Sequence, residues 1–480
     1  MYFDSTSNEI TVISLTMVWV LLISLGFYIG FVAIVRHRGI RSADGFLTRA
    51  PLLMLPISFI AAQFSTNVLS VFTAIADRFG YLIFIYFAII FSALWFFYLV
   101  FKKIRPLSDS PYPALAINEA LSTNKASRFY AYMMTSIVIF YAIFIGWELY
   151  IITQILSPIV FPGLPTNQAG VTIASLMLGT IAIYSTMTGL GSVVKTDLLQ
   201  VGVAFALVVA IIFGNWHRLE PLSFSTMQPA ADLSFNEVWR FLLLAALANY
   251  AIHPMQPFLW QIGTSAGQHA GRVLAWGLAG AFLVWTIFVI ISFVFIGPAF
   301  PAMFQFEHPV MNAMVVLGIA AVFMSTSDTI VVSSIYGLHS AWHLSHKRDA
   351  NDHTVADLRW VRAAIPVLLI VAFLTTWSLM KSESNFIDAI LSVGGCFIVF
   401  APIYWIYAFN KPHWVQRYSG YKVELLFAGF IAAILLQGFL TYQGLLDYGL
   451  HVVVGCLLFN FLVAALPISK SISSSSLKTA

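Results

Sequence analysis

The stretch PVMNAMVVLGIAAVFMSTSDTIVVSS, residues 309–334, is a long apolar run that contains a single charged side chain, Asp328. A helix needs about 20 mostly apolar residues to cross the hydrocarbon core of a bilayer. This run is longer than that and continues to residue 341, so it predicts a membrane-spanning helix. Comparable runs recur along the whole sequence, which predicts a polytopic membrane protein.

The composition supports this interpretation. Of the 480 residues, 60% are hydrophobic and 9% are charged, whereas a soluble protein carries about 25% charged residues. Such a chain is not a cytosolic enzyme, a disordered chain, a nucleic-acid-binding protein or a disulfide-stapled secreted domain. The runs are long and do not alternate polar with apolar residues, which favours helices over the strands of a barrel.

We predict thirteen spanning helices, so the expected fold class is an all-α polytopic membrane protein. The predicted spans are 11–35, 52–76, 80–102, 129–158, 169–187, 194–214, 236–262, 270–297, 309–341, 360–380, 386–408, 423–442 and 446–467. They form one transmembrane domain over residues 1–467. The remaining residues, 468–480, are Ser-rich and are expected to be a disordered cytoplasmic tail.

The positions of the basic residues predict the orientation of the chain in the membrane. Cytoplasmic loops carry an excess of Lys and Arg. If the N-terminus lies outside, all of the 24 Lys and Arg residues except Arg78, Arg218, Arg240 and Lys381 fall on the cytoplasmic side. We therefore expect an external N-terminus, a cytoplasmic C-terminus and a location in the inner (cytoplasmic) membrane of the cell.

Three acidic residues fall inside predicted spans: Glu148, Asp197 and Asp328. An ionisable side chain at the centre of a membrane costs roughly 2.5–3.5 kcal/mol, so such residues are candidates for function. With no Lys or Arg deep enough to neutralise them, the three acids indicate a route for a cation or a proton. Two alternatives stay open: Asp197 beside Lys195 faces water, or Glu148 is a protonated, hydrogen-bonded core residue.

A cluster of oxygen-bearing side chains surrounds Asp328, running from Ser325 to Thr329. Ser325, Asp328 and Thr329 are spaced i, i+3, i+4, which places them on one helical face. Hydroxyl and carboxylate oxygens are the ligands that a hard cation such as Na⁺ prefers. The alternative is that these hydroxyls bond to carbonyls of their own helix or to a neighbouring helix.

Two predicted spans are interrupted by polar residues or prolines. AAQFSTN (61–67) lies in the second span, and NYAIHPMQP (249–257) lies in the seventh. Proline removes a backbone donor and breaks the helical ladder, and transporters build their binding sites from broken helices at the membrane midplane. Each broken span would be the first of five consecutive spans. This predicts two core repeats of five spans each, at about 52–214 and 236–408.

These breaks and the acid in the fourth span supply the candidate solute-binding side chains. They are Gln63, Ser65, Thr66, Asn67, Glu148, Tyr250, His253 and Gln256.

The stretch YSTMTGLGSVVKTDLLQ (184–200) resembles the sodium/solute symporter family, whose members carry sugars, proline, pantothenate or sialic acid. The family pattern is Tyr-Ser/Thr-x-x-Gly-Gly-Leu-x-Ala/Ser-Val followed by Thr-Asp-x-x-Gln, and Thr188 here replaces its first glycine. The matching residues are Tyr184, Ser185, Gly189, Leu190, Ser192, Val193, Thr196, Asp197 and Gln200. MST (324–326), GG…FAP (394–402) and the thirteen-span layout also agree with the family.

The resemblance implies a LeuT-like five-plus-five inverted repeat with extra flanking helices, and two cation sites. The ligands of the first Na⁺ would be the carbonyls of Ala61, Phe64 and Val322 and the hydroxyls of Ser325 and Thr326. A second site would comprise Asp197, Asp328 and Thr329, where Asp328 replaces a family hydroxyl. Two carboxylates at one small site repel each other unless a cation or a proton lies between them.

The sequence thus predicts a secondary transporter, not an enzyme, that couples Na⁺ entry to uptake of a small polar organic solute. Its expected partners are the solute, Na⁺ as coupling ion and membrane lipid, with no organic cofactor, no nucleic acid and a monomeric state. No P-loop pattern for ATP use occurs in the chain. The alternatives are a proton-coupled symporter that uses Asp197 and Asp328, or a transporter-like solute sensor.

Overall fold

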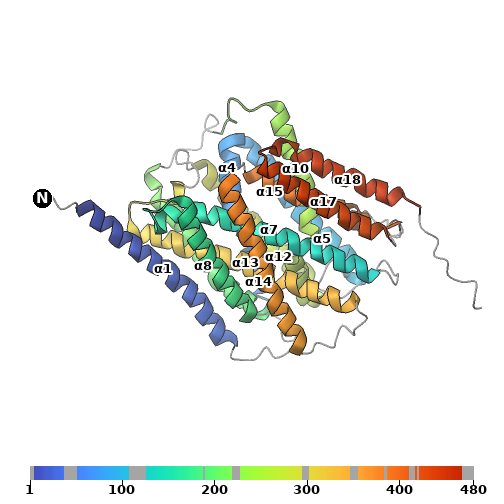
Figure 1. Cartoon of the computed structure of the whole chain (residues 1–480), viewed down its shortest axis with the longest axis horizontal. Helices are drawn as coiled ribbons and strands as arrows, with labels where there is room; N and C mark the ends of the chain where they lie inside the picture. The colour runs from blue at the N-terminus through green and yellow to red at the C-terminus, as the bar shows by residue number, and fades with distance from the viewer. Residues whose placement is uncertain are drawn as a thin grey trace, which may run out of the picture.

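The computed structural model describes most of the chain and is helical throughout its regular part (Figure 1). The described residues are 5–36, 51–107, 126–187, 190–218, 227–294, 302–345, 355–382, 386–409, 414, 417–418 and 421–467. The predicted tail, 468–480, lies outside them.

The described helices follow one another along the chain. The main elements are α1 (Ser5–Arg36), α3 (Leu55–Gln63), α4 (Thr66–Phe79), α5 (Ile83–Ile104), α7 (Ala126–Val160), α8 (Thr166–Met187), α9 (Leu190–Gly214), α10 (Phe235–Ile252), η4 (His253–Met255), α11 (Pro257–Ser265), α12 (Ala270–Val294), α13 (Pro309–Ser345), α14 (Val355–Ser382), α15 (Phe386–Gly395), η7 (Cys396–Val399), α16 (Ala401–Ala408), α17 (Lys422–Tyr442), η9 (Leu446–Tyr448) and α18 (Gly449–Ala465).

Each predicted span overlaps one of these helices or a broken pair of them. Within the described residues, eight helices are long and apolar enough to cross a membrane. Three further apolar helices, Leu15–Phe31, Ile387–Val399 and Gly449–Ala465, are shorter. The protein is therefore a multi-pass membrane protein, while the full count of thirteen spans stays a prediction.

The first predicted interruption is present between α3 and α4. Phe64 ends α3 with φ −94° and ψ 70°, and its N–H donates to the Ala61 carbonyl at 3.0 Å. Ser65 is extended, with φ −102° and ψ 156°, and its hydroxyl accepts the N–H of Val68 at 3.2 Å. This N-cap starts α4 in a new direction.

The second interruption lies between α10 and α11, as the prolines predict. Helix α10 passes into the short η4, and Gln256 is extended, with φ −69° and ψ 110°. Pro257 occupies the first position of α11, where its missing N–H costs least. The indole N–H of Trp260 in α11 donates to the Pro254 carbonyl in η4 at 2.8 Å, so this hydrogen bond connects the two sides of the break.

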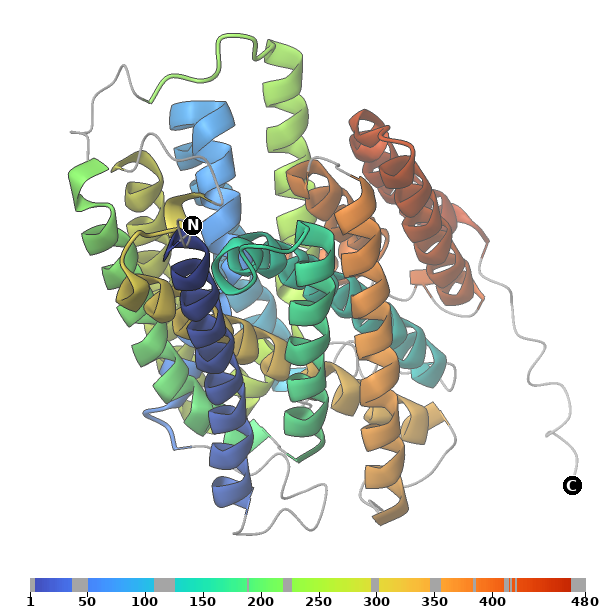
Figure 2. The ribbon, with the colours of Figure 1, turned by 60° about the vertical axis from the view of Figure 1, so that its left-hand side comes forward.

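Helix α13 forms the centre of the bundle. Of its apolar stretch, 94% is buried, the largest share among the eight long apolar helices. It contacts α9, α7, α3 and α1. Helices α1, α8 and α14 lie side by side along one side, and α17 and α18 pair at an edge (Figure 2).

Glycines bring α12 very close to α3. A Cβ added to Gly277 would lie 2.5 Å from Cγ of Phe59, and one added to Gly280 would lie 2.2 Å from Cδ1 of Ile60. Only the absence of side chains at these two positions lets the helices approach this closely.

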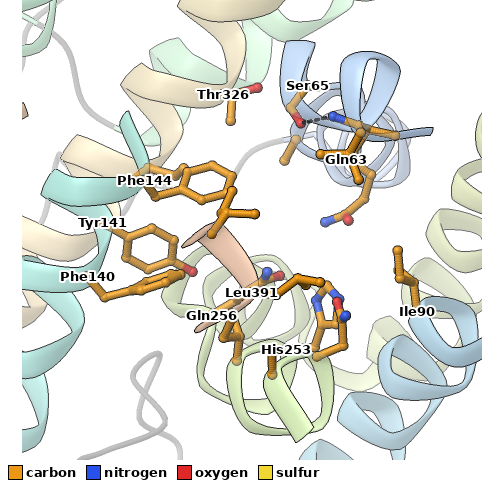
Figure 3. Close-up of a pocket in the computed structure, with 18 of the residues that line it drawn as sticks. Gln63, Ser65, Ile90, Phe140, Tyr141, Phe144, His253, Gln256, Thr326 and Leu391 are labelled. Atoms are coloured by element: carbon orange, nitrogen blue, oxygen red, sulfur yellow. Dashed lines mark hydrogen bonds between the residues drawn. The ribbon is translucent and has the colours of Figure 1, made fainter. Parts of the chain in front are cut away.

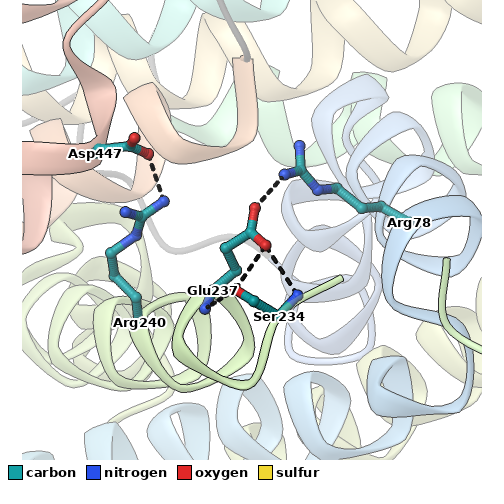
Figure 4. A network of polar contacts seen from close by, with 5 residues as sticks. All are labelled: Arg78, Ser234, Glu237, Arg240 and Asp447. Carbon is teal, nitrogen blue, oxygen red and sulfur yellow. Dashed lines mark hydrogen bonds and ion pairs between the residues drawn. The ribbon is translucent and has the colours of Figure 1, made fainter. Parts of the chain in front are cut away.

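Two ion pairs lie near the start of α10, on the external side by the predicted orientation (Figure 4). Arg78 at the end of α4 contacts Glu237 in the first turn of α10 at 3.0 Å. Glu237 also completes a capping box with Ser234. Arg240 contacts Asp447 in η9 at 2.5 Å. Exposed pairs of this kind stabilise a fold by about 0–1 kcal/mol each.

Gly146 supports a close crossing of α7 and α14, and its substitution by alanine is expected to destabilise the protein. The added Cβ would lie 2.3 Å from the Ala372 carbonyl oxygen, a backbone atom that cannot rotate away. We expect a loss of about 1–3 kcal/mol, measured as a lower thermal unfolding temperature in detergent. Gly179→Ala on α8 is the control, because nothing lies within 4 Å of its added Cβ. Equal unfolding temperatures for the two variants would contradict the prediction.

Candidate functional site

A cavity of about 150 Å³ lies between the two helix breaks (Figure 3). It is bounded by α3, α4, α5, α7, α10, η4, α11, α12, α13 and α15. Its polar lining residues are Gln63, Ser65, Tyr86, Tyr141, Asn249, His253, Gln256 and Thr326. The breaks therefore direct backbone and side-chain polar groups from two half-helices into one space.

Aromatic side chains make up much of the remaining lining. Phe140, Tyr141 and Phe144 of α7 lie along one side, with the Phe140 and Tyr141 rings 5.2 Å apart at 62°. Trp285 of α12 closes another side, and its indole N–H donates to the Gln63 carbonyl at 3.0 Å. This bond satisfies a carbonyl that the end of α3 leaves without a helical partner.

A short hydrogen-bond chain determines how His253 presents its ring. The Asn249 amide N–H donates to the Ala245 carbonyl at 2.8 Å, so its oxygen faces Nε2 of His253 at 3.2 Å. Nε2 then carries the proton and donates, which leaves Nδ1 as an acceptor. Nδ1 of His253 is buried and has no hydrogen-bond partner among the described residues.

The structure brings together half of the predicted solute-binding residues. Gln63, Ser65, His253 and Gln256 line the cavity. The side chains of Thr66 and Asn67 lie outside the part of the chain that the structure describes.

The other two predicted solute-binding residues do not line this cavity. Glu148 is buried one helical turn beyond Phe144 on α7. Tyr250 turns its hydroxyl toward α5, where it donates to Ser92 Oγ at 3.0 Å. Polar residues in or near a broken span need not face the cavity, because helix rotation decides which of them do.

A second cluster, centred on Asp197 of α9, joins three helices. The Asp197 carboxylate accepts hydrogen bonds from Ser58 of α3 and, at 2.9 Å, from Ser325 of α13. All three side chains are buried. The alternative in which Asp197 faces water is therefore wrong.

Asp328 and Thr329, the other members of the predicted second site, lie next to this cluster. The Thr329 hydroxyl donates to Asp328 Oδ1 at 3.2 Å, and Asp328 interacts electrostatically with Asp197. Asp328 is fully buried, and its Oδ2 has no hydrogen-bond partner among the described residues. Two buried carboxylates thus lie near enough inside the bundle to interact electrostatically.

The predicted first-site residues lie on α3, its C-cap and one stretch of α13. The Ala61 carbonyl accepts the Phe64 N–H, and the Val322 carbonyl accepts the Thr326 hydroxyl at 3.2 Å. The Ser325 hydroxyl points to Asp197. A hydroxyl or carbonyl that makes one hydrogen bond keeps a lone pair that a cation can use.

Three residues near the acids escaped the sequence-based candidate list. Ser58 donates to Asp197, and the Tyr184 hydroxyl lies 2.7 Å from Thr196 Oγ1 and interacts with Asp328. Gln200 is fully buried, and neither polar atom of its amide has a partner in the described structure. Tyr184 and Gln200 belong to the family motif at residues 184–200, and that motif could have identified them as candidate site residues.

The fold is that of LeuT-like secondary transporters, and the predicted fold class is confirmed. A Na⁺-coupled sialic acid symporter, in a substrate-bound outward-open state, matches with a TM-score of 0.63 at 17% identity, over 94% of this chain and 98% of that chain. Mhp1, a nucleobase-cation-symport-1 family transporter closed with bromovinylhydantoin bound, matches with a TM-score of 0.52 at 11% identity, over 88% and 94%. No protein-family model and no curated protein sequence matches the chain.

Proposed function

We propose that the protein is a Na⁺-coupled symporter of the sodium/solute symporter type that carries a small polar organic solute into the cytoplasm by alternating access. A fold shared with two transporters, one of them Na⁺-coupled, supports transport rather than enzymatic catalysis. In this proposal the protein works as a monomer in the cytoplasmic membrane, with its N-terminus outside and its C-terminus in the cytoplasm. Na⁺ is the coupling ion, and no organic cofactor takes part.

One observation carries the proposal: a buried carboxylate is held between the broken helix and the central helix. Ser58 and Ser325 orient Asp197 between α3 and α13. Helix α3 ends at Phe64, whose N–H donates to the Ala61 carbonyl in place of a regular helical bond. Carbonyl, hydroxyl and carboxylate oxygens close together form the ligand set that Na⁺ prefers. A cation bound there would hold α3, α9 and α13 in one arrangement.

The Asp197, Asp328 and Thr329 cluster supplies a second cation or proton site in the same proposal. The electrostatic interaction of the two buried carboxylates favours it, since a cation or a proton bound there removes their repulsion. A proton-coupled symporter that uses this pair, with the Ser325 and Thr326 site purely structural, is the alternative that the same observation supports.

The membrane potential makes such coupling effective. Each positive charge that crosses the membrane gains about 2.3 kcal/mol per 100 mV, enough for roughly 50-fold accumulation of an uncharged solute.

Reconstituted protein will separate Na⁺ coupling from proton coupling. In proteoliposomes with an inward Na⁺ gradient, we expect inward currents on addition of transported members of a panel of small polar metabolites. With an inward pH gradient in choline medium, we expect no such currents. Currents driven by the pH gradient alone would overturn Na⁺ coupling and support the proton alternative.

A further inference from the structure

The lining of the central cavity carries no formal charge of the kind that binds an ionic solute. None of the described residues that line it is Asp, Glu, Lys or Arg. Glu148, the buried acid on the same helix as the aromatic side, lies outside the lining. Moving an ion from water into such a space without a partner is costly, so the cavity selects an uncharged solute.

The two half-helices that begin at the cavity are also poorly suited to bind a carboxylate. Half-helix N-termini bind anionic solute groups through free N–H groups. In α4 the Ser65 hydroxyl already accepts the N–H of Val68. In α11 the first residue is Pro257, which has no N–H. Each N-terminus therefore offers fewer free N–H donors than an uncapped helix without proline would.

The unpartnered polar atoms of the cavity are mainly acceptors. Nδ1 of His253 accepts, and Oε1 of Gln256 is a second acceptor; both atoms are buried and form no hydrogen bond with good geometry in the described structure. The two side chains lie near enough to each other to interact, so one solute edge can reach both. The Tyr141 hydroxyl is buried without a partner as well and can donate. Figure 3 shows these three side chains pointing toward the same space from α7 and the α10–α11 break. A matching solute presents N–H donors to one side and a carbonyl to the other.

The size and the aromatic lining indicate a flat ring. A cavity of roughly 150 Å³ accepts a single six-membered ring such as benzene. Phe140, Tyr141 and Phe144 provide the aromatic surface against which a planar ring packs.

We propose that the transported solute is an uncharged, planar nitrogen heterocycle of the cyclic amide type, with its ring N–H groups on His253 and Gln256 and a ring carbonyl on Tyr141. The proposal rests on the proposed function, because it takes the central cavity as the solute site.

Thermal unfolding of the full-length protein in detergent and Na⁺ tests the class. Uracil and 2-pyridone, which are uncharged and carry ring N–H donors, are expected to raise the unfolding temperature in a concentration-dependent way. Orotate adds a carboxylate to the uracil ring, and 1,3-dimethyluracil lacks the N–H donors; neither is expected to cause a shift. The proposal is overturned if neither uracil nor 2-pyridone stabilises the protein, or if orotate or dimethyluracil stabilises it as strongly as uracil.

Gln256→Leu tests the orientation, with Gln437→Leu as its matched control. Gln437 is also a buried amide whose polar atoms have no partner in the described structure, but it lies on α17, outside the cavity lining. We expect Gln256→Leu to weaken uracil binding about tenfold and Gln437→Leu to leave it unchanged. Equal affinities in the two variants would overturn the assigned contact. Stabilisation by Na⁺ alone, measured in the same samples, reports on the proposed function independently of any solute.

Discussion

Replacing Asp197 by asparagine is expected to abolish Na⁺-driven uptake. The carboxylate accepts from Ser58 and from Ser325, so it links the proposed second cation site to a hydroxyl of the proposed first site. A unit charge about 4 Å from a cation contributes roughly 4 kcal/mol at an effective dielectric constant of 20. Loss of that charge should lower Na⁺ affinity at least about a hundredfold.

Titration of the unfolding temperature with Na⁺ measures this affinity without knowledge of the solute. Asp447→Asn is the matched control, because Asp447 is an exposed carboxylate in an ion pair far along the chain from the site. The control is expected to keep the wild-type Na⁺ response. An Asp197→Asn protein that folds and binds Na⁺ within threefold of wild type would show that the buried carboxylate is not part of a cation site.

Substitution of Asp328 is expected to change how uptake depends on pH and on the number of Na⁺ ions. Asparagine removes one of the two interacting carboxylates, so the Hill coefficient for Na⁺ should fall to about one and the pH dependence should flatten. Serine restores the hydroxyl group that the sodium/solute symporter family has at this position. We expect Asp328→Ser to flatten the pH dependence but to keep the Hill coefficient for Na⁺. The different outcomes separate a proton role from a ligand role.

Uptake measured across a Na⁺ titration at several pH values provides both quantities. Ser327→Ala is the control, since Ser327 is the buried neighbour of Asp328 and its hydroxyl has no partner among the described residues. If both Asp328 variants behave as Ser327→Ala does, Asp328 takes part in no cation or proton site.

Sequence reasoning located the backbone breaks well because their causes are local. Pro254 and Pro257 remove backbone donors, and Ser65 is a good N-cap, so each break is encoded by residues at the break. The buried state of Asp197 was harder to predict, because Lys195 nearby allowed an exposed position. Its partner Ser58 is 139 residues away in the chain, and a serine in a membrane helix usually bonds to its own backbone.

The composition of the cavity was predicted only in part. His253 and Gln256 stood out as polar residues within a proline-broken span. Phe140, Tyr141 and Phe144 gave no signal, since aromatic residues at helical spacing usually belong to the core. Glu148 gave a signal as a buried acid, yet its side chain lies outside the lining. The rotation of α7 about its axis depends on how it packs against its neighbours, and a single sequence does not encode that directly.

The seam of Gly277 and Gly280 against Phe59 and Ile60 limits which parts of the molecule can move independently. Because Phe59 and Ile60 fill the space that side chains at these glycines would need, we expect α3 and the adjoining part of α12 to move together. Helix α12 also packs along α4. If the two half-helices reorient during transport, we expect the backbone to bend at Phe64 and Ser65, the non-helical residues between α3 and α4.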